Sequence, residues 1–193
     1  LSSSSAASDV YKRQRFGWMP RLDVLVLEKV LAHLRGHDQV LALNLSAATL
    51  ADPKALHRIF ELLGQNAALG PRLVFEIGEE QLPEQTALEQ LTRRLHGLGF
   101  GLALQRFGGR FSMIGNLAHL GLAYLKIDGS YIRNIDHEQH KRLFIEAIQR
   151  AAHSIDLPLI AERVETEGER RVLQEMGVGG IQGQLVGEPA PWR

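Results

Sequence analysis

The stretch QVLALNLSAATLADPKALHRIFELL, residues 39–63, decides the fold class of this chain. It begins with a short apolar run, QVLALNLS, of the kind that forms a buried β-strand. Asp52 then precedes Pro53, and this pair is typical of the N-cap and first position of a helix. Apolar residues follow at the spacing of one helical face: Leu56, Ile59, Phe60 and Leu63. The stretch therefore predicts a strand followed by a helix.

The same unit recurs towards the C-terminus. Five further strand candidates are RLVFEI (72–77), GFGLALQ (99–105), AYLKID (123–128), LPLIAERVE (157–165) and GIQGQLV (180–186). Helices are expected between them, on stripes formed by Leu88, Leu91 and Leu95, and by Leu143, Phe144, Ala147, Ile148 and Ala151. Thr166 and Glu169 have the spacing of a capping box for a last helix, which Gly177 ends. A first helix is expected over residues 22–34, and Gly36 is expected to terminate it. Its apolar face consists of Leu27, Val30, Leu31 and Leu34.

Alternating strands and helices predict an α/β fold with parallel strands, either an open doubly wound sheet or a (β/α) barrel. An eight-stranded barrel needs about two more units than the six counted here. A barrel truncated at its N-terminus accounts for that difference.

The first 14 residues, LSSSSAASDVYKRQ, have no apolar periodicity and lack the features of a signal peptide. We expect residues 1–14 to be a non-native or disordered leader, similar to translated adaptor sequence, and residues 15–193 to form the domain.

Composition excludes several classes of function. The 22 basic residues balance the 22 acidic ones, so we expect no binding to duplex nucleic acid and no membrane contact. No apolar run reaches the roughly 20 residues that cross a bilayer. The chain has no cysteine, which removes disulfides, zinc thiolates and thiol nucleophiles.

Polar residues stand at the carboxyl ends of all six strand candidates. In parallel α/β folds this edge of the sheet carries the site. One such residue alone is more often a cap or a loop tether, but six in register predict one pocket. Amide and carboxylate oxygens beside a lysine suit hard cations and a phosphate. The residues are Asn44, Glu76, Gln105, Arg106, Lys126, Asp128, Glu162, Glu165 and Gln182.

Six ordered motifs resemble those of the EAL-domain family of cyclic-di-GMP phosphodiesterases and receptors. They are LNLS (43–46), FEIGEE (75–80), QRFGGRFS (105–112), YLKID (124–128), IAERVE (160–165) and IQGQLVGEPAP (181–191). The resemblance implies a TIM-like (β/α)8 barrel whose active members hold two divalent cations over the scissile phosphate. By position it makes Asn44 and Glu76 metal ligands, Lys126 and Glu162 the residues beside the attacking water, and Glu165 and Gln182 further pocket residues.

Two departures from the family pattern bear on activity. Active members carry two metal-ligating aspartates where this chain has Gln105 and Arg106, and glycine where it has Arg163. An arginine about 4 Å from a divalent ion would be repelled by on the order of 8 kcal/mol at most. We therefore expect no catalysis and no bound metal, with Lys126, Glu162, Asn44 and Glu76 as vestiges of an active site. Arg106 either donates to a ligand phosphate or turns to solvent.

The chain looks most like LapD-type receptors, in which a degenerate cytoplasmic EAL domain of a bacterial inner-membrane protein binds cyclic-di-GMP and controls a periplasmic protease. This resemblance implies a receptor in biofilm signalling that needs no cofactor, takes cyclic-di-GMP as its ligand and forms a homodimer. Two alternatives stay open. One is a residual phosphodiesterase that recruits metal through Asn44, Glu76 and Glu162, and the other is a docking or dimerisation module with a vestigial pocket.

Overall fold

The computed structural model describes residues 17–187, apart from the side chain of Phe111. The chain divides into two compact units. The first comprises the described residues up to Ile77 together with Gln81–Gly101, and the second comprises Gly78–Glu80 together with the residues from Leu102 onward. The expected leader, residues 1–14, lies outside the described residues, so it stays a prediction together with the domain boundary at residue 15.

The first unit contains two parallel strands, β1 (Leu41–Asn44) and β2 (Leu73–Gly78), in which Asn44 is paired with Glu76. Its helices are α2 (Trp18–Gly36), α3 (Ala47–Leu50), α4 (Pro53–Gly64), the 3-10 helix η1 (Ala67–Arg72) and α5 (Gln85–Gly97). The predicted apolar faces form the core, since Leu27, Leu34, Ile59, Leu63 and Leu95 are all buried. The helix expected at 22–34 begins earlier, at Trp18.

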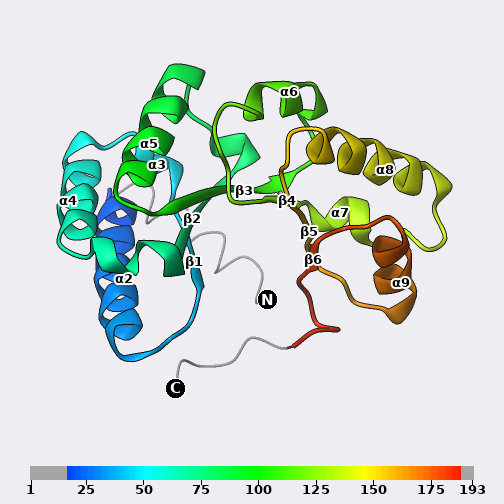
Figure 1. Cartoon of the computed structure of the whole chain (residues 1–193), viewed down its shortest axis with the longest axis horizontal. Helices are drawn as coiled ribbons and strands as arrows, with labels where there is room; N and C mark the ends of the chain where they lie inside the picture. Colours follow the sequence, from blue (N-terminus) through cyan, green and yellow to red (C-terminus); the bar gives the residue numbers. More distant parts are fainter. Residues whose placement is uncertain (1–16, 188–193) are drawn as a thin grey trace. The chain divides into compact units, whose positions relative to one another are not determined.

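The second unit contains four parallel strands in sequence order: β3 (Gly101–Phe107), β4 (Leu125–Ile127), β5 (Leu159–Ala161) and β6 (Gly180–Ile181). They alternate with the 3-10 helix η3 (Phe111–Met113) and with α6 (Ile114–Leu117), α7 (Gly129–Ile132), α8 (Gln139–His153) and α9 (Glu167–Glu175). The two longest helices, α8 and α9, lie to the outside of β4–β6 (Figure 1).

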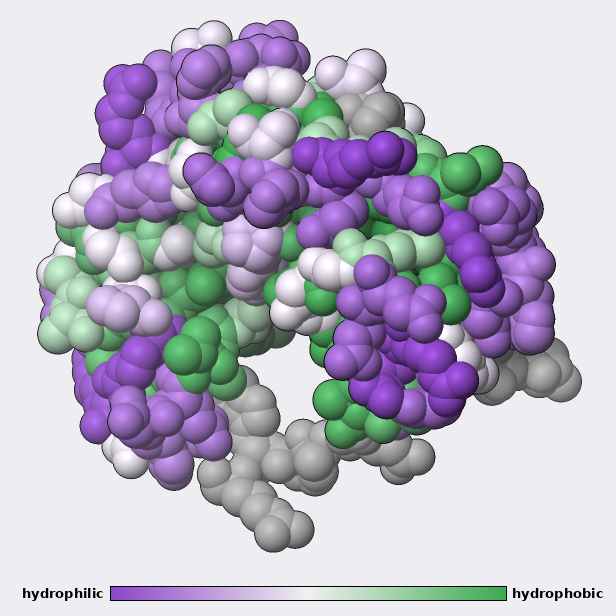
Figure 2. Space-filling view, turned by 45° about the vertical axis from the view of Figure 1, so that its right-hand side comes forward, coloured by the Kyte–Doolittle hydropathy of each residue, from purple (hydrophilic) through white to green (hydrophobic). Residues whose placement is uncertain are grey.

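The prediction of an α/β fold with parallel strands is confirmed. Strand and helix alternate throughout, and the strands follow sequence order within each unit, as they do in a (β/α)8 barrel. Residues 17–187 supply six of the eight strands that such a barrel has. Hydrophilic residues predominate on the face that Figure 2 shows, with hydrophobic areas between them. None of the described helices is both long and apolar enough to cross a membrane.

Three details of the predicted elements are wrong. The last strand was expected over 180–186, but β6 covers only Gly180–Ile181. Helix α8 buries Ile145, Ile148 and Ala152, whereas Leu143, expected in the core, is 55% exposed. The neighbouring Phe144 ring packs against Tyr131 of α7, with 4.6 Å between the ring centroids. Strand β5 ends at Ala161, so Glu162 and Glu165 lie in the loop that follows it.

The predicted helix caps are confirmed. Asp52 accepts hydrogen bonds from the backbone N–H groups of Lys54 (2.9 Å) and Ala55 (3.2 Å) at the start of α4. At the start of α9 the Thr166 hydroxyl accepts from the N–H of Glu169 at 3.2 Å, and the Glu169 carboxylate accepts from the N–H of Thr166 at 3.1 Å. Gly177 follows α9 with a φ of 75°, a left-handed conformation that ends the helix.

Replacing the capping hydroxyl tests the energetic weight of this box. Thr166→Ala should lower the free energy of unfolding by about 1 kcal/mol, because the N–H of Glu169 loses its acceptor. Thr166→Ser keeps the hydroxyl and should lose less than half as much. Urea denaturation followed by circular dichroism measures both, and equal losses in the two variants would show that the methyl group, not the cap, matters.

Candidate functional site

A cavity of about 600 Å³ opens at the carboxyl ends of the strands of the second unit. Every residue that lines it belongs to that unit. The lining is polar and carries charges of both signs. It consists of Gln105, Arg106, Asp128, Glu162, Arg163, Glu165, Gln182, Gly183, Gln184 and Gly187.

A β-bulge directs the end of β3 into this cavity. Leu104 pairs with Leu125 and Phe107 pairs with Ile127, so β3 has one residue more than β4 between the two pairs. The extra residue falls at Gln105 and Arg106, and Arg106 has a φ of 53°. A bulge bends the strand and redirects its side chains, which is why bulges are frequent beside binding sites.

Asp128 lies at the end of β4 and caps α7. Its Oδ1 accepts from the backbone N–H of Ser130 at 2.8 Å. Partial burial acts to raise the pKa of the Asp128 carboxyl, but the hydrogen bonds with Ser130 and the charges of Arg163 and Arg106 outweigh it. The pKa therefore lies below its ordinary value, and Asp128 is ionised at neutral pH.

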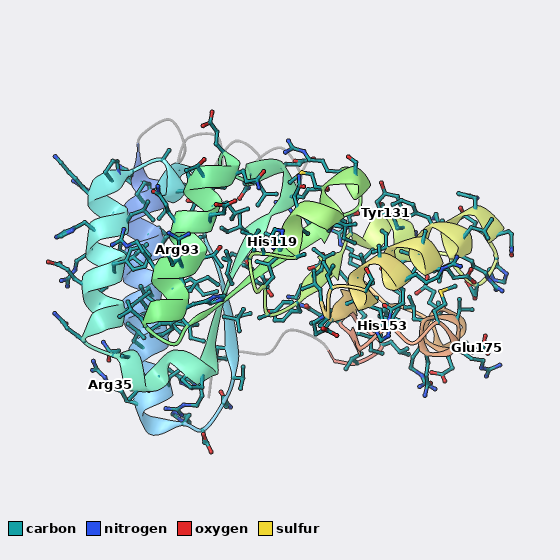
Figure 3. All side chains as sticks on the ribbon, turned by 45° about the horizontal axis from the view of Figure 1, so that its top comes forward. Arg35, Arg93, His119, Tyr131, His153 and Glu175 are labelled. Carbon is teal, nitrogen blue, oxygen red and sulfur yellow. The ribbon has the colours of Figure 1, made fainter. Side chains whose placement is uncertain are left out.

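The loop after β3 is held by a buried carboxylate. Glu79 is 4% exposed, and its two oxygens accept hydrogen bonds from the backbone N–H groups of Gly108 (3.2 Å), Gly109 (3.0 Å) and Arg110 (2.5 Å). From the other side the ring of Tyr131, labelled in Figure 3, covers Gly108 so closely that a Cβ there would lie 2.2 Å from Tyr131 Cε2. The loop that follows Arg106 is thus fixed on both sides.

A second buried carboxylate, that of Glu169, holds the loop after β5. Besides its capping contact with Thr166, it accepts from the N–H groups of Glu165 and Asn134, each at 2.8 Å. Glu165 lines the cavity, so Glu169 ties this part of the rim to the segment that follows α7. Glu79 and Glu169 have the same role. The carboxylate of each accepts hydrogen bonds from loop backbone N–H groups that have no partner in a strand.

The structure brings six of the nine predicted site residues together around the cavity: Gln105, Arg106, Asp128, Glu162, Glu165 and Gln182. Lys126 does not line it. This residue is 8% exposed within β4, with its Nζ 5.8 Å from the centroid of the Tyr124 ring. Asn44 and Glu76 belong to the first unit, where they are paired across β1 and β2, with Asn44 exposed and Glu76 buried.

Sequence reasoning left out part of the lining. Arg163 stood out as a departure from the family pattern but was not placed in the site, although its position directly after Glu162 was a usable signal. The lining contributed by Gly183, Gln184 and Gly187 follows from a short β6 and the turn after it. Glu79 could be found only from the fold, because its partners lie about 30 positions along the chain.

The profile of the EAL domain matches residues 13–189, which is most of the chain. The chain belongs to the EAL-domain family. An uncharacterized signaling protein of Caulobacter vibrioides is 33% identical over 153 residues, covering 78% of this chain and 19% of that protein. The chain spans about a fifth to a quarter of the length of the curated relatives that it matches.

Solved EAL-domain structures share the fold. The PaMucR phosphodiesterase in complex with c-di-GMP has a TM-score of 0.86 and 26% identity, covering 96% of this chain and 78% of that one. The S helix-GGDEF-EAL part of Vibrio cholerae LapD has a TM-score of 0.83, covering 92% of this chain and 44% of that one. At 21% identity, the likeness to LapD shows the fold alone.

Metal-dependent EAL domains need a cluster of anionic oxygen ligands, and the donor set in this EAL domain does not fit that need. Within residues 17–187, no group of three or more histidine and carboxylate side chains is placed to hold a metal ion. The cavity has three carboxylates, those of Asp128, Glu162 and Glu165. Gln105 offers only a neutral oxygen, and Arg106 and Arg163 add two positive charges to the same lining. A divalent ion near Asp128 would be repelled by both arginines. We therefore derive no catalytic step through a metal.

The Glu79 tether can be tested without a ligand. Glu79→Gln should raise the hydrogen-exchange rates of Gly108, Gly109 and Arg110 by about tenfold or more, because an amide offers one acceptor oxygen where the carboxylate offers two. Amide exchange measured by NMR is the readout. Glu80→Gln, at the exposed neighbouring position, is the matched control and should leave these rates unchanged. Unchanged rates in Glu79→Gln itself would contradict the tether.

Proposed function

We propose that this EAL domain is a receptor that binds cyclic-di-GMP and does not hydrolyse it. The observation that carries the proposal is the bulge at the end of β3, which places Gln105 and Arg106 in the cavity of the second unit. A guanidinium at this point can donate two parallel hydrogen bonds to the oxygens of a phosphodiester. The complex of the related PaMucR phosphodiesterase with c-di-GMP supports the choice of ligand.

The chemistry of the lining supports binding over turnover. Hydrolysis of a phosphodiester needs an activated water and stabilisation of the charge that develops on the leaving oxygen. Glu162 lines the cavity, and Gln105 offers one neutral oxygen. Arg106 and Arg163 offer no oxygen ligand and would repel the cations that activate water. Arg106 still offers the positive charge that phosphate requires, so binding persists on this account without any cofactor.

The wider context follows from the same proposal. The chain spans only a fraction of its relatives, so we place it as the cytoplasmic receptor domain of a longer bacterial inner-membrane protein, paired as a homodimer through its EAL domains. Other parts of that protein would carry the signal to a periplasmic protease in the control of biofilm formation. The resemblance of the sequence motifs to those of LapD-type receptors motivates this placement.

Calorimetric titration of cyclic-di-GMP into the chain, in EDTA and in magnesium, tests the proposal. We expect the same affinity in both buffers and intact nucleotide in the recovered solution. Arg106→Gln should weaken binding by about tenfold or more, because a charge-assisted hydrogen bond is lost. Arg171→Gln, an exposed arginine of α9 outside the cavity, is the matched control and should bind as the parent chain does.

Two results would contradict the receptor. Release of the linear dinucleotide in manganese, abolished by Glu162→Gln, would make the domain a phosphodiesterase. Absence of binding in both buffers would leave a docking module whose cavity is vestigial.

A further inference from the structure

Arg163 is the second cation of the cavity. It lies in the loop after β5, Arg106 lies near the end of β3, and Asp128 directly follows β4, the strand between them. All three residues line the cavity, and the charges of both arginines lower the pKa of Asp128. The two arginines and the carboxylate thus reach one cavity from the ends of three adjacent strands.

Both arginines have a backbone conformation that arginine rarely adopts. Four non-glycine residues in the described part of the chain have a positive φ: Arg106 (53°), Asn134 (60°), Asp156 (54°) and Arg163 (57°). Asparagine and aspartate tolerate the left-handed region, whereas a long side chain there is unfavourable by on the order of 1 kcal/mol. Strain at two positions of one cavity points to a role in that cavity.

Each arginine side chain also lies over a glycine. A Cβ on Gly129 would come within 2.6 to 2.8 Å of the Cβ, Cγ and Cδ of Arg163. The Cβ of Arg163 is fixed by the backbone, so this stem lies where it does only because residue 129 has no side chain. A Cβ on Gly78 would lie 2.9 Å from one terminal nitrogen of Arg106, a looser restraint because that end of the side chain is flexible.

The guanidinium donors have no other use in the described structure. Neither Arg106 nor Arg163 donates a hydrogen bond or forms a salt bridge at close range within residues 17–187. Both arginines are exposed, so water can solvate these donors in the free protein. A guanidinium has five N–H donors and no acceptor, so both groups are available to an anionic ligand that displaces this water. The cavity also holds the carboxylates of Asp128, Glu162 and Glu165, so its net charge does not attract anions. An anionic ligand therefore has to be bound by direct contact with the two arginines.

We propose that Arg106 and Arg163 together form a phosphate clamp, in which two guanidinium groups bind the phosphodiester oxygens of the ligand in place of divalent cations and Asp128 serves as their shared counter-charge. This proposal rests on the proposed function and assigns a ligand-binding role to Arg163. Gly129 is the positioning residue of the clamp, because its lack of a side chain admits the stem of Arg163.

Arg163→Gly distinguishes a clamp from a structural residue. Glycine adopts a φ of 57° without strain, so the variant should have a higher urea midpoint than the parent chain. At the same time it should bind cyclic-di-GMP in EDTA about tenfold or more weakly, because charge-assisted hydrogen bonds are lost. A merely structural arginine would change stability without changing affinity.

Gly129→Ala tests the positioning role. In the parent chain, the added methyl group should displace Arg163 and weaken the binding of cyclic-di-GMP about as much as Arg163→Gly does. In the Arg163→Gly background it should have no further effect on affinity, because no side chain remains to be displaced. Arg171→Gln is again the control for a general loss of positive charge, and it should leave affinity unchanged.

The two proposals fail in different ways. If the parent chain and Arg163→Gly bind with affinities within about twofold of each other, the clamp is wrong and the receptor function stands. If the parent chain does not bind cyclic-di-GMP at all, the receptor function is wrong and the clamp falls with it. Additive losses for Gly129→Ala and Arg163→Gly would overturn the positioning role of Gly129 alone.

Discussion

The carboxylate of Glu79 is the contact on which the cavity of the second unit depends. It accepts from three consecutive backbone N–H groups, those of Gly108, Gly109 and Arg110, which have left the strand ladder. Gly108 is buried, so its N–H group would otherwise lack an acceptor. These residues directly follow Arg106, so the same contact fixes where β3 ends. Tyr131 closes the other side of the loop over Gly108. The bulge that exposes Gln105 and Arg106 is therefore a constrained feature of the fold.

Electrostatics then determines what the cavity can hold. An EAL domain that uses metal gathers carboxylates, and the cations neutralise them. This domain adds Gln105 and two arginines to the carboxylates of its cavity, and the charges of both arginines favour the ionised form of Asp128. Positive charge built into the chain is permanent, because arginine does not release its proton at any physiological pH. On this account a phosphodiester ligand meets cations that are already in place and needs no ion from solution.

Much of this arrangement could be predicted from the sequence, because local signals encode it. The pairs Asp52–Pro53 and Thr166–Glu169 mark helix starts by chemistry within four residues, and the structure shows both caps. Six of the nine predicted site residues line one cavity, because the carboxyl ends of parallel strands lie at the same edge of the sheet. Non-local geometry could not be predicted. Lys126 is buried and does not line the cavity, and the partners of Glu79 are distant in sequence. The close approach of Arg163 to Gly129 depends on the conformation of the loop after β5.

A crystal structure of the chain grown with cyclic-di-GMP in the presence of EDTA tests the central claim most directly. The account predicts that the guanidinium groups of Arg106 and Arg163 both lie within hydrogen-bonding distance of phosphodiester oxygens, about 2.7 to 2.9 Å, with no ion between them. Phosphates that contact neither arginine, with both guanidinium groups directed to solvent, would contradict it.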